Sequence, residues 1–371
     1  MKIVYLSAST LPSRTANSIH VMKMCQAFVS AGHEVMLYAR KGNGKNSHDS
    51  LFCYYGVKKT FKIKLLRHFR LPYYGHIYGL FIACHAFFAK PDLVIARHPA
   101  GCFFSTLFGL PTVFEIHGPI SESGKMTRFY FELIRKLPSF KKLVLITHTL
   151  KQHYLAKYKD LNQKEIVVLP DAADNVDLSE ITPKGIRLKD KLNIGYTGHL
   201  YKGKGMEVIA PLVTECLEYH FHIVGGRDKD ISFWSERLKS NSNVSFHGAV
   251  AHSDIVEYLV DFDIVLLPNQ MEVSGNAGKD IGNWTSPLKL FEYMAARKCI
   301  IASDIPVLRE VLNENNALLC NPNNIDDWVS AIKVVAGDRN IRNNIAKNAF
   351  NDFINNYTWA KRANNIIESI G

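Results

Sequence analysis

Two segments in the second half of the chain carry residues whose types and spacing suit phosphate binding. The first reads IGYTGHLYKGKG over residues 194–205, a buried strand followed by a glycine-rich loop and the start of a helix. Glycines allow a backbone to approach a ligand closely, and a helix N-terminus carries a partial positive charge. Lys204 would add a full charge to a diphosphate bound there. The alternative is a tight turn with solvated lysines, because glycine loops are common.

The second segment reads WTSPLKLFEYMAA over residues 284–296. Ser286 suits an N-cap and Pro287 suits the first position of a helix. Lys289 would then lie in the first turn, where the helix dipole disfavours a cation and a bound anion would remove the conflict. Glu292 lies in an otherwise apolar stretch, and a buried carboxylate needs partners that sugar hydroxyls can provide. The alternative for Glu292 is an exposed position on an amphipathic helix.

The elements that would position these residues alternate between short apolar runs and helical patterns. The expected strands are residues 2–7, 34–39, 93–96, 112–115, 143–147 and 166–169 in the first half and 192–197, 220–225, 243–247, 263–267, 299–302 and 317–319 in the second. These runs are continuously apolar, as in a parallel sheet that is covered on both faces. The rhythm predicts an α/β protein with two doubly wound, Rossmann-like domains.

Prolines and aspartates interrupt this rhythm near the middle of the chain. We therefore expect an N-terminal domain over residues 1–170, a linker over residues 171–190 and a C-terminal domain over residues 191–357. Ligands of doubly wound sheets bind at the carboxyl ends of the strands. The two domains are accordingly expected to face each other across a cleft that holds the ligands.

Charge is distributed unevenly between the two halves of the 371-residue chain. The first 170 residues hold 24 Lys and Arg against 8 Asp and Glu, a net charge of +16, whereas the remainder has a net charge of −5. A basic half implies an acidic partner. The first apolar run ends at Ser7, which is too short for a leader peptide. Seven scattered cysteines without CxxC spacing favour a reducing cytoplasm.

Several longer segments together resemble one enzyme family. They are GHLYKGKG, then SPLKLFEYMAARKCIIASDIPVLREVL, then YTWAKRA, preceded in the first half by LPSRTANSIHVMKMCQAFVSAGHEVMLYAR and FEIHGP. In this order they resemble the retaining family 4 glycosyltransferases of the GT-B fold, over nearly the whole chain. The resemblance implies a sugar transfer from a nucleotide-diphosphate sugar to a glycan or lipid-linked acceptor, with no cofactor. It also implies that the helix near residues 358–370 crosses back onto the first domain.

The resemblance further implies roles for particular residues. Those that would bind the donor diphosphate are His199, Lys204, Ser286, Leu288 and Lys289. Leu288 would contribute its backbone amide, and His199 stands where many relatives have arginine. Glu292 would bind the ribose hydroxyls of the nucleotide. His117, in FEIHGP, would contact the transferred sugar as the catalytic residue; without the family pattern, a structural histidine would be the default interpretation.

The chain departs from the family pattern at three places. Trp284 stands eight residues before Glu292, where relatives often have a second acid, which weakens any mechanism with paired carboxylates. Pro287 replaces a usual glycine, so that one amide donor to phosphate is lost. The opening loop lacks the usual glycine pair. Arg14 and Asn17 in this loop are candidate contacts for the acceptor or a phosphate, and a plain surface position is the alternative for Arg14.

No metal site is expected from the sequence. Asp228 and Asp230 match the D-x-D form that a different glycosyltransferase fold uses for metal, but they lie between a strand-end turn and a helix. Acidic residues there favour the helix N-terminus. The fifteen histidines include no H-x-x-x-H pattern on a helix beside an acid.

A basic and aromatic segment precedes an uncharged stretch in the first half. Residues 58–70 contain six lysines and arginines among large apolar residues, which suits an anionic membrane surface; a solvated basic face is the alternative. Residues 71–89 contain no charged side chain, but their proline, glycines and histidines disfavour a membrane-spanning helix. We expect a helix buried in the first domain instead.

The function expected from the sequence is that of a metal-independent hexosyltransferase in cell-surface polysaccharide synthesis. It would act in the cytoplasm, at the periphery of the inner membrane face. Two alternatives are a sugar-nucleotide 2-epimerase and a non-catalytic protein that binds nucleotide sugars. Nucleic acid is not an expected partner, because the second half has no aromatic residues interleaved with basic ones.

Overall fold

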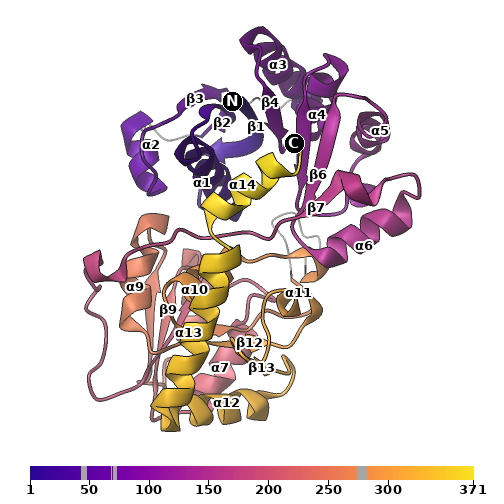
Figure 1. Cartoon of the computed structure of the whole chain (residues 1–371). Helices are drawn as coiled ribbons and strands as arrows, with labels where there is room; N and C mark the ends of the chain where they lie inside the picture. The colour runs from indigo at the N-terminus through magenta and orange to yellow at the C-terminus, as the bar shows by residue number, and fades with distance from the viewer. Residues whose placement is uncertain (43–47, 68, 70–72, 274–281) are drawn as a thin grey trace. The chain divides into compact units, whose positions relative to one another are not determined.

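The computed structural model describes residues 1–42, 48–67, 69, 73–273 and 282–371 (Figure 1). These residues form two compact units. The first unit comprises Met1–Pro170 and Trp359–Gly371, and the second unit comprises Asp171–Thr358. Residues 171–190 belong to the second unit, where the backbone amides of Gly185 and Ile186 donate to the carboxylate of Asp261 at 2.7 and 3.0 Å.

The first unit is built on a seven-stranded parallel sheet in the order β3-β2-β1-β4-β5-β6-β7. The strands are β1 (Lys2–Leu11), β2 (Glu34–Lys41), β3 (Lys62–Leu66), β4 (Leu93–Ala96), β5 (Thr112–Ile116), β6 (Phe140–Leu145) and β7 (Ile166–Val168). The helices are α1 (Ala16–Ser30), α2 (His48–Tyr54), α3 (Tyr74–Ala89), α4 (Pro99–Leu107), α5 (Lys125–Ile134), α6 (His148–Lys157) and α14 (Trp359–Glu368). The central strands β4 and β5 are wholly buried, which explains their continuous apolar runs.

The second unit repeats this architecture with a six-stranded parallel sheet in the order β10-β9-β8-β11-β12-β13. The strands are β8 (Asn193–Thr197), β9 (His220–Val224), β10 (Val244–Gly248), β11 (Ile264–Leu267), β12 (Cys299–Ser303) and β13 (Leu318–Cys320). The helices are α7 (Met206–Glu215), α8 (Asp228–Arg237), α9 (Ile255–Asp261), α10 (Leu288–Ala295), α11 (Pro306–Arg309), α12 (Ile325–Gly337) and α13 (Arg339–Asn356). The predicted α/β architecture with two Rossmann-like domains is therefore confirmed.

Strand order reverses once in each sheet, and the reversal marks where ligands of such sheets bind. In the first unit it falls between β1 and β4, and in the second between β8 and β11. The loop after β8 holds the glycine-rich segment, and the chain after β11 leads into α10. Both phosphate-binding candidates of the second unit are thus placed on the two sides of its reversal point.

Strand β3 was not expected from the sequence. It lies within the basic segment 58–70 and forms the edge of the first sheet, where Lys62 and Lys64 are exposed while Ile63 is partly buried. Exposed lysines on an edge strand prevent pairing with other chains. Part of this basic segment therefore has a structural explanation. Residues 68 and 70 lie outside the described part of the chain.

Helix α3 shows that the expectation of a buried helix over residues 71–89 is wrong for one of its faces; residues 71 and 72 lie outside the described part. One side packs closely against α4, because a Cβ on Gly79 would lie 2.5 Å from the Cβ of Ala100. The other side exposes large apolar side chains at intervals of three to four residues or multiples of them. Among them are Tyr73 (76% exposed), Ile77 (61%), Phe81 (47%) and Phe88 (81%). Within the described residues, no helix combines the length and the apolarity needed to cross a membrane.

Candidate functional site

Lys289 is the most unusual charged residue of the second unit. It lies in the first turn of α10, and its Nζ is buried with no hydrogen-bond partner among the described residues. The Nζ lies 3.9 Å from the centroid of the Tyr196 ring, close enough for a cation–π interaction. Burial, and then the charge of Lys204, holds the pKa of Lys289 well below its usual value, although Glu292 acts in the opposite direction. A buried ammonium without an acceptor is costly, so this position favours a bound anion.

Lys204 supplies a second cation beside Lys289. Burial lowers the pKa of Lys204 to about 8. Its loop is held by Tyr196, whose hydroxyl lies 2.7 Å from the carbonyl oxygen of His199 and 2.9 Å from that of Lys204. Burial lowers the pKa of His199, and the charges of Lys204, Arg227 and Lys289 lower it further. The structure thus brings together His199, Lys204 and Lys289 around one tyrosine.

The glycines of this loop have a structural role. Glu207 accepts hydrogen bonds from the amides of Gly203 at 3.0 Å and Gly205 at 3.3 Å, which leaves those two donors engaged. A Cβ on Gly203 would lie 2.2 Å from the carbonyl oxygen of Glu272. For these two amides the tight-turn interpretation is therefore the better one, and the positive charge of the loop comes from Lys204.

The start of α10 differs from the predicted capping. The helix begins at Leu288 with Pro287 as its N-cap and no side-chain cap. Ser286 is not the cap, because its Oγ accepts the backbone amide of Asp171 at 2.9 Å. The amides of the first turn, including those of Leu288 and Lys289, thus have no capping side chain. The helix tip and the Lys289 cation can act on the same anion.

Glu292 follows Lys289 on α10 and is hydrogen-bonded to a histidine. Its Oε1 lies 2.7 Å from the Nε2 of His252, and both side chains are largely but not completely buried. His252 lies in a short 3-10 helix over His252–Asp254. A carboxylate with one oxygen held in place can still accept sugar hydroxyls through its other oxygen. No motif in the sequence indicates His252 or Tyr196 as site residues.

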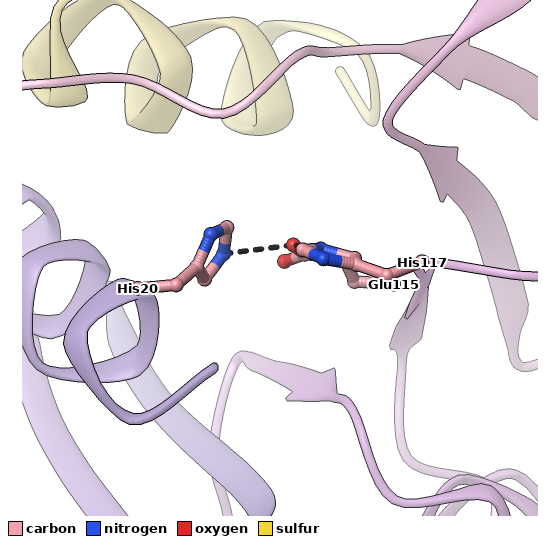
Figure 2. A group of neighbouring side chains, drawn as sticks. All are labelled: His20, Glu115 and His117. Carbon is pink, nitrogen blue, oxygen red and sulfur yellow. Dashed lines mark hydrogen bonds and ion pairs between the residues drawn. The ribbon is translucent and has the colours of Figure 1, made fainter. Parts of the chain in front are cut away.

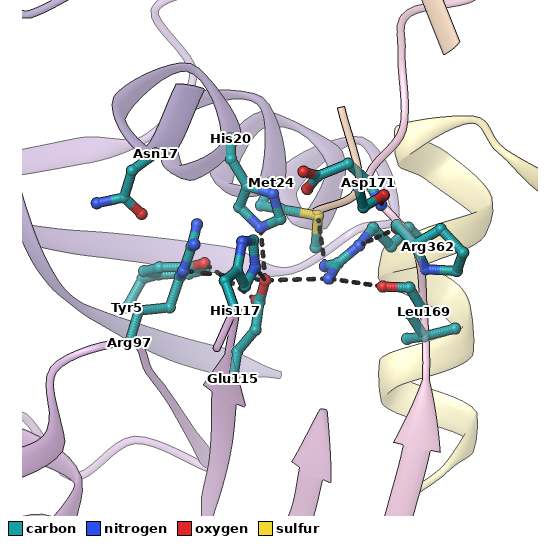
Figure 3. Close-up of polar contacts among 12 residues, drawn as sticks. Tyr5, Asn17, His20, Met24, Arg97, Glu115, His117, Leu169, Asp171 and Arg362 are labelled. Atoms are coloured by element: carbon teal, nitrogen blue, oxygen red, sulfur yellow. Dashed lines mark hydrogen bonds and ion pairs between the residues drawn. The ribbon is translucent and has the colours of Figure 1, made fainter. Parts of the chain in front are cut away.

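In the first unit the notable group surrounds Glu115, which lies in the central strand β5 (Figure 2). Its Oε1 lies 2.7 Å from the Nε2 of His117 and 2.8 Å from the Nε2 of His20. The same oxygen accepts a hydrogen bond from the Nη2 of Arg362 at 3.0 Å, and the Nε of Arg97 lies 3.9 Å away (Figure 3). Four cationic or protonatable groups thus surround one buried oxygen atom.

Arg362 reaches this group from α14, near the end of the chain. Its guanidinium also donates to the carbonyl oxygens of Pro170 at 2.8 Å and Leu169 at 3.3 Å. Trp359, one turn earlier, packs edge-on against the ring of His20 at 5.1 Å. The last helix therefore completes the surroundings of Glu115.

The charges around Glu115 decide its protonation state. Burial alone would raise the pKa of this carboxyl, but Arg362, His20 and Arg97, together with the hydrogen bond from His117, outweigh burial and hold the pKa well below its usual value. Glu115 is accordingly ionised at neutral pH. We call Glu115, His20, His117, Arg97 and Arg362 the carboxylate cage.

Arg14 and Asn17 lie at the start of α1, and both are exposed. The amide of Asn17 donates to the Oγ of Ser9 at 2.7 Å, which ties the first turn of α1 to β1. Neither residue belongs to the carboxylate cage. Their role in acceptor binding stays a prediction.

Comparisons with known proteins address the family. A model for glycosyl transferases group 1 matches residues 191–338, and a model for glycosyltransferase family 4 matches residues 18–175. The chain belongs to these glycosyltransferases. No curated protein matches the sequence. The predicted family and enzyme class are thus confirmed.

Solved structures show the fold of this glycosyltransferase. A glycosyltransferase from Rickettsia africae is 16% identical, with a TM-score of 0.75 over 99% of this chain and 97% of the other. HepE from Anabaena, in complex with UDP and glucose, is 14% identical, with a TM-score of 0.73 over 100% and 99%. WaaG, a glycosyltransferase involved in lipopolysaccharide biosynthesis, is 13% identical, with a TM-score of 0.68 over the whole of both chains. The fold is GT-B.

Metal binding by the glycosyltransferase was not expected, yet the described residues include one group with suitable geometry. The ligand atoms of His20, Glu115 and His117 lie within 4.8 Å of one another. Two arginines, Arg97 and Arg362, lie against the same carboxylate oxygen. A divalent cation would face these two fixed positive charges at short range. The surroundings of Glu115 therefore stabilise its negative charge and disfavour a bound metal ion.

Sequence reasoning missed most of the carboxylate cage of this glycosyltransferase. His117 was selected through the resemblance alone, and Glu115 was quoted only as part of FEIHGP. One signal was present, because a charged residue within the apolar run TVFEI is rarely buried without partners. That signal identifies Glu115 but not Arg362, which is 247 residues away.

Proposed function

We propose that this glycosyltransferase transfers a sugar from a nucleotide-diphosphate donor to a glycan or lipid-linked acceptor, with retention of configuration and without a metal ion. The observation that carries the proposal is the pair of cations, Lys204 and Lys289, beside the uncapped tip of α10. The Nζ of Lys289 is buried with no hydrogen-bond partner among the described residues. A diphosphate is the ligand whose charge fits this pair best.

The chemistry of the donor explains why positive charge is needed. When the bond between sugar and diphosphate breaks, negative charge grows on the phosphate and positive charge on the sugar ring. Fixed positive groups that stabilise this charge are the main source of catalysis in such sites. Lys204, Lys289, His199 and the tip of α10 would perform this role. A metal ion would be redundant there, and full turnover in excess EDTA is the expected result.

Retention of configuration is implied by the resemblance to the retaining family. Trp284 replaces the second acid of the family pattern, so no paired carboxylate is available from that position. The leaving phosphate would take the proton from the acceptor hydroxyl on the same face, and His117 would orient the sugar. NMR of the product checks this, because an inverted anomeric centre would rule out the same-face substitution.

A thermal-shift screen across nucleoside diphosphates tests the donor site directly, since a ligand stabilises the state that binds it. Because HepE is described with UDP and glucose, UDP is the first probe. We expect a rise in Tm for the cognate diphosphate that is lost in Lys289→Met. An equal rise in wild type and variant would contradict the assigned site.

Attachment to an anionic membrane surface, predicted for residues 58–70, would suit a lipid-linked acceptor in cell-surface polysaccharide synthesis on the cytoplasmic face. The exposed apolar face of α3 supports this proposal more strongly than the basic segment does. Ile77, Phe81 and Phe88 offer apolar area for insertion, and Lys62 and Lys64 offer charge. Each basic residue near such a surface contributes about 1 kcal/mol, or roughly a fivefold change in partitioning.

Vesicle co-sedimentation tests membrane attachment. Wild-type protein should bind vesicles containing anionic lipid, and Ile77→Ser with Phe88→Ser should release it. Val334→Ser is the matched control, because Val334 is an exposed apolar residue of α12 in the second unit. Equal binding by wild type and the α3 variant would contradict the proposal.

A further inference from the structure

Two histidines share one oxygen of Glu115, but only one of them can reach a ligand. The His117 side chain is 25% exposed, whereas that of His20 is 1% exposed and its ring packs between the rings of His117 and Trp359 at 5.0 and 5.1 Å. His20 therefore contributes to the interior of the first unit. His117 is the member of the pair that links this interior to the surface.

The contact with Glu115 determines which nitrogen of His117 carries the proton. An ionised carboxylate can only accept hydrogen bonds, so the Nε2 that lies 2.7 Å from Oε1 must be the protonated nitrogen. In the neutral imidazole this leaves the lone pair on Nδ1. His117 is thus set to accept a hydrogen bond from a hydroxyl through Nδ1, as histidines are when a carboxylate holds the other nitrogen.

Arg362 makes this arrangement rigid. Its guanidinium binds Glu115 and at the same time two carbonyl oxygens that follow β7, those of Leu169 and Pro170. These bonds anchor the guanidinium to backbone. The carboxylate is therefore held on one side by a fixed charge from α14 and presents Oε1 to His117 in one place.

We propose that Glu115 and Arg362 are positioning residues, which hold His117 as the Nε2-protonated tautomer so that Nδ1 accepts a hydroxyl of the transferred sugar. The inference rests on the proposed contact between His117 and that sugar. The new element is the series of contacts in which Arg362 of α14 holds Glu115 of β5, and Glu115 in turn holds His117. It also assigns to the last helix a part in catalysis by the first unit.

The tautomer can be measured without any substrate. In full-length protein labelled with ¹⁵N-histidine, we expect the His117 signals at neutral pH to show a protonated Nε2 and an unprotonated Nδ1, with His117→Gln used for assignment. Glu115→Gln should weaken this preference, because a neutral amide is a weaker acceptor than a carboxylate. Glu132→Gln is the matched control, since Glu132 also pairs with an arginine of the first unit. An unchanged tautomer in Glu115→Gln would overturn the proposal.

Kinetics with the sugar nucleotide selected by the thermal-shift screen supply the second readout. Glu115→Gln should lower kcat by about 10–100-fold with little change in KM, the range found when the partner that orients a functional histidine is removed. Arg362→Lys should have a smaller effect, because lysine keeps the positive charge but cannot donate several hydrogen bonds in the fixed planar geometry of a guanidinium. Combining Glu115→Gln with His117→Gln should cost no more than His117→Gln alone. Additive losses would overturn the proposal.

Two further results separate this inference from the proposed function. If His117→Gln turns over normally, the proposed sugar contact is wrong, whereas the tautomer experiment still decides the positioning of the ring. If Glu115→Gln does not fold, the paired replacement Glu115→Leu with Arg362→Met removes the carboxylate together with its closest arginine, so that Arg97 is the one arginine of the cage that remains. That variant should fold, show a mixed tautomer and have a lowered kcat; a wild-type tautomer and kcat would contradict the proposal.

Discussion

The two units handle buried charge in opposite ways. In the first, the buried carboxylate of Glu115 is surrounded by positive partners that hold its pKa low. In the second, the buried ammonium of Lys289 has an aromatic ring below it, a second lysine nearby and no hydrogen-bond partner among the described residues. Among the described residues, the carboxylate of Glu115 is fully paired, whereas the amine of Lys289 has no hydrogen-bonded partner.

This difference indicates where a ligand is expected. A compensated cluster contributes stability and fixes geometry, whereas an uncompensated one costs stability until a partner binds. Stability and function should therefore respond differently to substitutions in the two units. The predictions below test this contrast, from the largest expected effect to the smallest.

Removing a member of the carboxylate cage should damage stability most. Arg362→Met leaves Glu115 without its closest arginine, and breaking a buried pair in this way costs about 3–5 kcal/mol. This loss in the free energy of unfolding can be measured by urea unfolding, with hydrogen exchange as the probe of the first unit. The exposed pair of Arg309 and Asp304 offers a control, because an ion pair in solvent contributes little and Arg309→Met should change stability much less. Equal effects of the two substitutions would remove the contrast between the units.

Removing Lys289 should have the opposite effect, a loss of activity without a loss of stability. Lys289→Met should cost about 2–4 kcal/mol of transition-state stabilisation, which is about 30–1000-fold in kcat/KM, while leaving Tm unchanged or higher. Lys204→Ala should lose activity to a similar extent.

Lys298 provides the matched control for Lys289, because it is a partly buried lysine of the same unit whose Nζ donates to the carbonyl oxygens of Phe262 at 2.8 Å and Val260 at 3.1 Å. Lys298→Met should lower Tm and leave kcat/KM near wild type. A lower Tm in Lys289→Met would show that its ammonium is already compensated in the free protein.

Binding of a nucleoside diphosphate should be coupled to proton uptake. Because burial lowers the pKa of Lys204 to about 8, this group is half deprotonated at pH 8, and a bound anion would restore the proton. Calorimetry with UDP in buffers of different ionisation enthalpy should therefore report an uptake of about half a proton at pH 8 through this group, and less at pH 7. A binding enthalpy that is independent of the buffer would contradict the open anion site.

The first unit should lose stability in one more pH window than the second. Burial lowers the pKa of His222 in the second unit and of His98 in the first unit to about 3, so the unfolded state of each takes up the proton first and both units lose stability as pH falls below about 6.5. The pKa of Glu115 is lowered instead from about 4.5, so its contribution to the first unit persists until pH falls below that value and is then lost as well. Hydrogen exchange in each unit at pH 7, 5.5 and 4 measures both windows, and equal further losses in the two units between pH 5.5 and 4 would contradict the role of Glu115.

Much of the fold could be predicted from the sequence, because strands buried on both faces leave uninterrupted apolar runs. Twelve runs predicted from hydropathy correspond to strands of the two sheets. The strand that was missed, β3, lies at an edge, where Lys62 and Lys64 face solvent and interrupt the apolar run. The local composition fits an edge strand and a basic surface segment equally well. The pairing with β2 in the structure shows that it is a strand.

The site was less predictable, because its decisive contacts are not local. Lys204, Lys289 and Glu292 could be selected because a short motif carries them. The capping role predicted for Ser286 failed because the amide of Asp171, 115 residues earlier in the chain, occupies its hydroxyl. No local sequence pattern around Glu115 or Arg362 predicts that these two residues pair.

The separation between Glu115 and Arg362 has a consequence for biosynthesis. During translation, 247 further residues must be polymerised after Glu115 before its arginine exists. At about 5–20 residues per second this takes about 12–50 s, and the whole of the second unit is synthesised within it. Throughout that interval the nascent first unit holds an acid in its centre without its main counter-ion. Helix α14 therefore completes a unit whose other elements are synthesised before the whole of the second unit.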